Sequence, residues 1–142
     1  MRRMIVLLVV TAVVLAFAAG AVLAKDVSCN GGLCNGTRGN DEILGSELPD
    51  LINGRAGIDA INSGHGADAI IGGSGNDGVL LGDTGEDQIY GGKGNDVINS
   101  RDSSQGPGSA ASGIDYVDCG PGSQDRVAAD AEDTLVNCEI HL

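Results

Sequence analysis

The chain repeats itself every nine residues from Gly36 to Asn99, and this period limits what it can fold into. Each block has an aspartate at its sixth place and an aliphatic residue at its eighth. One extra residue, which we assign to Leu81, interrupts the count after the fifth block. The aspartates are Asp41, Asp50, Asp59, Asp68, Asp77, Asp87 and Asp96, and the aliphatic residues are Ile43, Ile52, Ile61, Ile70, Val79, Ile89 and Ile98. A fixed short period of this kind is typical of solenoids, in which stacked repeats share one continuous core.

Each block divides into six turn-forming residues and three that can extend. In a strand, the pattern x-aliphatic-x directs a single apolar side chain to one face. Two blocks then form one coil with two short strands, and the aliphatic residues of successive coils meet between two parallel sheets. The sequence therefore predicts an all-β fold, a parallel β-roll (a β-solenoid), whose core is a narrow column of β-branched and other aliphatic side chains.

The composition shows that this core is small. Outside the first 24 residues the only aromatic residues are Tyr90 and Tyr116, and glycine accounts for 23 residues. Ordering so much glycine backbone costs more entropy than so little apolar surface offsets. The formal net charge is −12 and becomes −14 without Arg2 and Arg3. This charge argues against nucleic acid and anionic membranes as partners and favours cations.

The turns contain the groups that bind a hard cation. Glycine at places one, two and four permits crowded backbone angles, so carbonyl oxygens can turn toward a common point. Calcium takes about six to eight oxygens at about 2.3–2.6 Å, a mixture of carboxylates and carbonyls that one turn cannot supply but two stacked turns can. Paired carboxylates should therefore be 18 residues apart, or 19 across the extra residue. Because stacked carboxylates repel one another, we expect calcium binding and folding to be one event.

The turns GGSGND (72–77) and GGKGND (91–96) carry a specific resemblance. With the aliphatic place that follows, they are similar to the GGxGxDxUx nonapeptide of the RTX (repeat-in-toxin) calcium-binding family. The resemblance covers Gly36 to Asn99 and implies a roll that is disordered without Ca²⁺ and binds several Ca²⁺ ions. The expected metal ligands are Asp41, Asp59, Asp68, Asp77, Asp87 and Asp96, with Gly57, Gly66, Gly72, Gly75, Gly82, Gly85, Gly91 and Gly94. We expect Asp50 to bind poorly, because Leu48 and Pro49 replace favourable turn residues.

The first 24 residues have the layout of a secretory signal peptide. Arg2 and Arg3 precede an apolar run, and Val22-Leu23-Ala24 supplies small residues for cleavage. We expect a signal-peptide helix over 1–24, cleavage after Ala24 and a secreted, extracellular mature chain without a membrane span. Cleavage after Ala21 and a retained anchor are the alternatives, although the run is short for a spanning helix.

The remaining boundaries follow from changes in the period. We expect an N-terminal cap segment over 25–35, the regular repeats over 36–99 and a flexible loop over 100–111, where Ser, Gly and Pro dominate. Degenerate repeats and a C-terminal cap should occupy 112–142, because solenoids need atypical terminal repeats. The degenerate blocks place Asp115, Asp125 and Asp133 at the sixth position and Val117, Val127 and Leu135 at the eighth. Whether these three aspartates bind calcium is left open.

The four cysteines form two pairs that are close in sequence. An even number in an exported chain indicates disulfides, and proximity favours Cys29 with Cys34 and Cys119 with Cys138. Zinc ligation is the alternative, although the spacing is a poor match to zinc sites.

No set of residues in the sequence suggests catalysis. The only imidazoles are His65, at a variable turn position, and His141, next to the C-terminus, and neither has a nucleophile beside it. The sequence therefore predicts a secreted calcium-binding protein that is not an enzyme. The alternative is a cell-surface or matrix adhesion component that binds an unknown protein or glycan with a face of the roll.

Overall fold

The computed structural model describes residues 24–102 and 113–142. The expected signal-peptide helix and most of the loop expected over 100–111 lie outside these residues. Within them, Ser100 is fully buried, so the roll extends at least to this residue. None of the described residues forms a helix that is long and apolar enough to cross a membrane.

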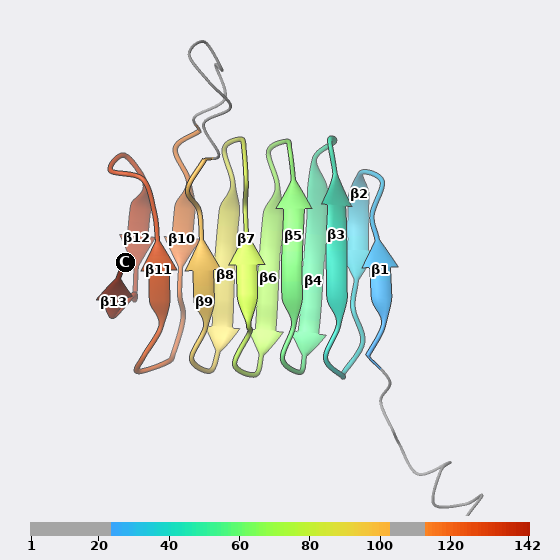
Figure 1. Ribbon diagram of the computed structural model, residues 1–142, viewed down its shortest axis with the longest axis horizontal. Coiled ribbons are helices and arrows are strands. Elements are labelled where there is room, and N and C mark those ends of the chain that lie inside the picture. Colours follow the sequence, from blue (N-terminus) through green and yellow to red (C-terminus); the bar gives the residue numbers. More distant parts are fainter. Residues whose placement is uncertain (1–23, 103–112) are drawn as a thin grey trace, which may run out of the picture.

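The described chain folds into two parallel sheets that face each other, and it contains no helix (Figure 1). The odd-numbered strands form a seven-stranded sheet: β1 (Asp26–Ser28), β3 (Glu42–Ser46), β5 (Ala60–Gly64), β7 (Val79–Leu81), β9 (Val97–Asn99), β11 (Arg126–Ala128) and β13 (Ile140–His141). The even-numbered strands form a six-stranded sheet: β2 (Gly32–Asn35), β4 (Asp50–Ala56), β6 (Ala69–Ser74), β8 (Gln88–Lys93), β10 (Tyr116–Asp118) and β12 (Thr134–Val136).

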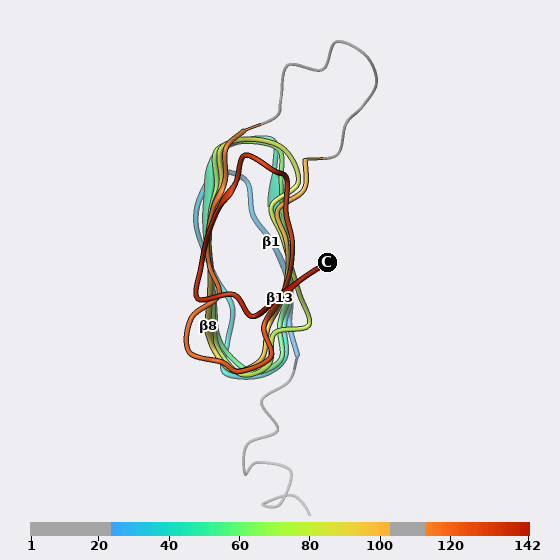
Figure 2. The same ribbon diagram turned by 90° about the vertical axis from the view of Figure 1, so that its left-hand side faces the viewer.

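Each coil contributes one strand to each sheet, and the next coil lies against it in parallel register. Ile43 pairs with Ile61, and Ile52 with Ile70, which are the 18-residue intervals expected from two blocks of nine. Seen along the stack, the coils overlie one another as a flattened ring (Figure 2). The predicted parallel β-roll is therefore confirmed.

The core is a single layer of aliphatic side chains between the sheets, because each short strand directs one residue inward. Those from the seven-stranded sheet are Ile43, Ile61, Leu80, Ile98 and Val127, and those from the six-stranded sheet are Cys34, Ile52, Ile70, Ile89 and Val117. All of these except Cys34 are at most 2% exposed. Leu135 of the last degenerate block is partly buried and packs against this layer.

One position of the predicted core is wrong. Val79 is 44% exposed, whereas Leu80 is fully buried and pairs with Ile61 and Ile98. The extra residue is therefore Gly78 and not Leu81. The Gly78 amide donates to the Asp59 carbonyl at 2.9 Å and delays the start of β7 by one position. Three consecutive aliphatic residues follow Gly78 in the sequence, and register with the neighbouring coils decides which of them faces inward.

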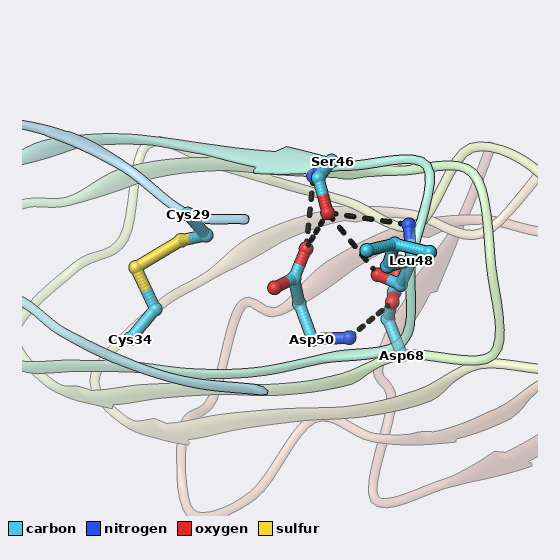
Figure 3. Close-up of a disulfide and its surroundings, with 6 residues drawn as sticks. All are labelled: Cys29, Cys34, Ser46, Leu48, Asp50 and Asp68. Carbon is cyan, nitrogen blue, oxygen red and sulfur yellow. Dashed lines mark hydrogen bonds between the residues drawn. A yellow bond between two sulfur atoms is a disulfide. The ribbon is translucent and has the colours of Figure 1, made fainter. Parts of the chain in front are cut away.

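Both predicted disulfides are present, one near each end of the roll. Cys29–Cys34 joins the residue after β1 to β2 with a Cα–Cα distance of 5.8 Å (Figure 3). Cys119–Cys138 ties the residue after β10 to the C-terminal segment at 5.2 Å. All four cysteines are paired, so none is left to bind zinc.

The corrected register predicts a difference between two neighbouring residues. Leu80→Ala should lower the free energy of unfolding of the calcium-saturated chain by about 2–5 kcal/mol, because it leaves a cavity in a one-layer core. Val79→Ala, the control, should change it by about 0.5 kcal/mol or less, as is usual for exposed positions. Urea unfolding followed by circular dichroism measures both. A larger loss for Val79→Ala would show that the register is wrong.

Candidate metal centre

The sixth-place aspartates form two ladders that run along the two turn edges of the roll. All of them except the partly buried Asp133 are at most 3% exposed. In each ladder the backbone N–H of one aspartate donates to Oδ1 of the aspartate one coil further on, at 2.7–3.1 Å. The first ladder is Asp41, Asp59, Asp77, Asp96 and Asp125, and the second is Asp50, Asp68, Asp87, Asp115 and Asp133. The structure thus brings together the carboxylates that the spacing placed on common edges.

The degenerate blocks continue both ladders. Asp87 donates to Asp115 although 28 residues separate them, and Asp96 donates to Asp125 across 29. Glu139 then accepts the Asp125 N–H at 2.9 Å and ends the first ladder. The aspartates of the C-terminal segment therefore occupy the same structural position as those of the regular repeats.

One oxygen of most ladder carboxylates is buried and has no hydrogen-bond partner among the described residues. It is the Oδ2 atom of Asp59, Asp68, Asp77, Asp87, Asp96 and Asp125. Buried polar atoms in folded proteins are normally hydrogen-bonded, and an unpaired carboxylate oxygen is especially costly to bury. A repeated, regularly spaced set of such atoms indicates that a ligand outside the chain completes them.

Burial changes the acidity of these carboxyl groups. Loss of water raises the pKa of Asp77 to about 6 and the pKa values of Asp87 and Asp115 to about 7. The backbone N–H from the preceding coil lowers each pKa, and neighbouring carboxylates raise it. Burial also raises the pKa of Asp59, Asp68, Asp96 and Asp125. Without a cation, the roll holds its ladder carboxyl groups in an environment unfavourable to their charge.

The glycines of the turns leave room for these oxygens. A Cβ atom on Gly54 would lie only 2.5 Å from Asp59 Oδ2, and one on Gly91 only 2.6 Å from Asp96 Oδ2. Gly36, Gly72 and Gly82 at the same first place meet their own aspartates equally closely. A side chain on any of these five glycines would therefore fill the space beside Oδ2, which is orphaned in all of their turns except that of Asp41.

The fourth-place glycines bring carbonyl oxygens to the same edges. Their φ values are strongly positive, between 126° and 140°, which residues with a Cβ atom rarely adopt. Four of the five lie so close to the corresponding carbonyl oxygen of the preceding coil that a Cβ atom would overlap it, whereas a Cβ atom on Gly66 would lie 3.2 Å from the carbonyl carbon of Leu48. These glycines are Gly57, Gly66, Gly75, Gly85 and Gly94, all of which the sequence predicted as ligands.

The donor atoms available in these turns fit calcium. They are carboxylate and carbonyl oxygens from two stacked turns, which is the mixture that this hard cation prefers. In the part of the chain that the structure describes, no three acidic, histidine or cysteine side chains cluster closely enough to hold a metal alone. An ion here would therefore need backbone carbonyls as well as Asp59, Asp77, Asp96 and their counterparts in the second ladder.

Two predicted turns differ from the rest. Both oxygens of Asp41 accept hydrogen bonds from protein donors, and Oδ2 of Asp50 accepts two from Ser46. The hydroxyl donors, Thr37 and Ser46, stand at the second place and are not among the residues predicted from the sequence to form the sites. The signal in the sequence is a hydroxyl residue at a place where three of the other five regular turns have glycine.

Comparison with known proteins identifies the repeats. Residues 44–79 and 78–102 match the family model of the RTX calcium-binding nonapeptide repeat (4 copies). No curated protein and no solved structure matches the chain. The resemblance found in the sequence is thus confirmed for residues 44–102, which contain five of the six aspartates expected to bind the metal.

The raised pKa values predict how the ion-free roll responds to pH. The pKa values of Asp77 and Asp87 are higher in the folded roll than the value of about 3.9 in the unfolded chain. These groups therefore stabilise the ion-free roll fully below about pH 3.9, and this stabilisation is lost as the pH rises through about 6–7. In chelator, the β signal in circular dichroism should therefore strengthen as the pH falls from about 8 to about 5. Replacing Asp77 and Asp87 together by Asn should flatten this dependence. An ion-free β signal that strengthens with rising pH would contradict the prediction.

Proposed function

We propose that this chain, whose residues 44–102 are RTX calcium-binding nonapeptide repeats, is a secreted, non-enzymatic protein that folds when calcium binds between its stacked turns. The observation that carries the proposal is the row of buried Oδ2 atoms without a hydrogen-bond partner. They recur at the same place in successive turns, and in the turns of Asp59, Asp77, Asp87 and Asp96 a first-place glycine keeps the space beside them open.

The residues of the chain supply the ligands, and calcium supplies the positive charge that the ladders lack. Asp59, Asp77 and Asp96 are stacked one coil apart, and their uncompensated charges repel one another in a poorly solvated environment. The aliphatic layer is one side chain thick and offsets little of the entropy of ordering the turns. Binding free energy therefore becomes folding free energy, as in other small metal-dependent domains.

Secretion accords with the leader-like sequence over 1–24 and with the two disulfides. Disulfides persist in oxidising compartments, and extracellular calcium modules bind with dissociation constants of about 10⁻⁴–10⁻³ M. A chain of this kind would remain unfolded where calcium is scarce and fold outside the cell. Support for a non-catalytic role is that the paired carboxylates, which could act as acid and base, lie buried within the ladders.

Circular dichroism of the mature chain tests coupled folding. The β signal should appear on titration with calcium and not with equal magnesium, because magnesium demands a tighter octahedral site and gives up its water reluctantly. A β fold that is fully formed in chelator at neutral pH would contradict coupled folding. Failure to bind calcium at all would contradict the function itself.

Two aspartate variants test whether the ligands rank as expected. Asp77→Ala should raise the calcium concentration at the folding midpoint by about tenfold, since it removes a carboxylate from the middle of a ladder. Asp50→Ala, the matched control in the other ladder, should raise it less, because Ser46 already occupies Oδ2 of Asp50. Equal effects would show that the two turns do not differ in binding.

A second candidate function, recognition of a partner, is favoured by a hollow on the outer face of the six-stranded sheet. The hollow has a volume of about 420 Å³ and is lined by Glu86, Gln88, Tyr90, Ile114 and Tyr116, above the buried Asp87. The two tyrosine rings, from β8 and β10, lie with their centroids 5.9 Å apart and their planes inclined by 52°. Tyr90 and Ile114 are 36% and 61% exposed, so apolar surface is available for binding.

The chemistry of this hollow suits an organic cation. Tyrosine faces attract ammonium and guanidinium groups, and the carboxylate of Glu86 adds to the attraction. The formal net charge of −12 also draws basic molecules toward the roll. We therefore propose a lysine or arginine side chain of a partner protein as the occupant.

Tyrosine fluorescence reports directly on this hollow, because the chain has two tyrosines and no tryptophan. Titration of the calcium-saturated chain with tetramethylammonium should give a saturable change that equal sodium chloride does not produce. Glu86→Gln should weaken the response, whereas Glu47→Gln, at an exposed turn remote in sequence, should not. An identical response to sodium chloride would rule out the cation site, and a saturable response to a neutral monosaccharide alone would favour a glycan.

A further inference from the structure

The first two turns of the roll are closed by the same set of hydrogen bonds. At Asp41, the N–H and hydroxyl of Thr37 donate to Oδ2 at 2.5 and 3.0 Å. At Asp50, the N–H and hydroxyl of Ser46 donate to Oδ2 at 2.8 and 2.9 Å (Figure 3). Each hydroxyl oxygen also accepts the N–H two residues further on, from Gly39 at 3.1 Å or Leu48 at 3.2 Å. The second place of each turn thus supplies two donors to the oxygen that is orphaned elsewhere.

The second place has a different backbone conformation in the other turns. Its φ is positive in six of them, at Arg55 (79°), Gly64 (88°), Gly73 (114°), Asp83 (66°), Gly92 (104°) and Gly120 (86°), whereas Thr37 and Ser46 do not have positive φ. The aspartates that follow these six residues are the same six whose Oδ2 atoms lack a partner. Arg55 and Asp83 adopt this conformation despite its steric cost of roughly 1–2 kcal/mol for a residue with a Cβ atom. A positive φ at the second place therefore does not require glycine.

We infer that the second place decides which turns bind calcium, and that the hydroxyls of Thr37 and Ser46 take the place of the ion in the first two turns. This inference rests on the proposed function. A carboxylate oxygen that already accepts hydrogen bonds from an N–H and an O–H gains less from a bound cation, because those hydrogen bonds already stabilise its negative charge. For a metal to bind Asp41 Oδ2, it would have to displace both donors of Thr37.

The remaining oxygens of these two aspartates differ from each other. Oδ1 of Asp41 accepts the backbone N–H of Lys25 at 3.0 Å, so the whole Asp41 carboxylate is satisfied by the chain. Oδ1 of Asp50 has no hydrogen-bond partner among the described residues, because the coil before it contributes no aspartate N–H. The two turns lie in the coils next to the Cys29–Cys34 bridge. The N-terminal end of the roll is thus held by a disulfide and hydroxyl groups, and calcium sites begin at the turn that contains Asp59.

A gain of one calcium ion is the sharpest test. Thr37→Gly converts the first turn from GTRGND to GGRGND, the pattern of residues 72–77 and 91–96. The number of ions bound per chain, measured by equilibrium dialysis of the whole mature chain at saturating calcium, should rise by one relative to the natural sequence. Thr37→Ser, the matched control, keeps the hydroxyl and should leave the number unchanged. A Thr37→Gly chain that binds no additional ion, or a Thr37→Ser chain that does, would overturn the inference.

A pair of losses tests the same point without altering a backbone angle. Asp41→Asn should leave the number of bound ions unchanged, whereas Asp77→Asn should lower it, because only Asp77 offers an orphaned oxygen. Equal losses would overturn the inference while leaving calcium binding intact. If the natural chain binds no calcium in the same assay, the proposed function fails, and the inference fails with it.

Discussion

The hydrogen bond from the backbone of one aspartate to the carboxylate one coil further on is the interaction on which the rest of the roll depends. It fixes the vertical register of successive turns and draws the carboxylate under the backbone, where water cannot reach it. Only one oxygen is satisfied in this way. The hydrogen bond that stacks the coils therefore also leaves the row of buried Oδ2 atoms without a partner. The stacking of the coils and the requirement for a cation both follow from this bond.

The aliphatic layer and the glycines have complementary roles. The aliphatic residues select which side of each short strand faces inward, but a layer one residue thick contributes too little to hold two sheets together. The glycines allow the turns to approach so closely that carbonyl oxygens line the edges. Glycine adds no side chain to the apolar core, which weakens it, but it also leaves room for ions between the turns. The same residues therefore reduce the hydrophobic stabilisation and make the ion sites possible.

Much of this arrangement could be predicted from the sequence because a strict period fixes both register and edge. The fold, the pairing of carboxylates 18 or 19 residues apart and both disulfides follow from spacing alone. The period predicts Val79 in the core, which is wrong, because a period cannot tell which of Val79, Leu80 and Leu81 aligns with Ile61. The different chemistry of the Thr37 and Ser46 turns could not be seen either, because a hydroxyl at a variable place has no meaning until the backbone angle there is known.

The pairing of β10 with β8 shows how the roll accommodates irregular sequence. Tyr116 lies beside Gln88 in the same register as every other coil, although the chain between them is about ten residues longer than elsewhere. Because a coil contacts only the coils above and below it, additional residues between two coils need not disturb the register of the stack. The architecture therefore tolerates the addition or removal of whole coils. Duplicating 18 residues would lengthen it by a coil and excising them would shorten it, with the remaining contacts intact.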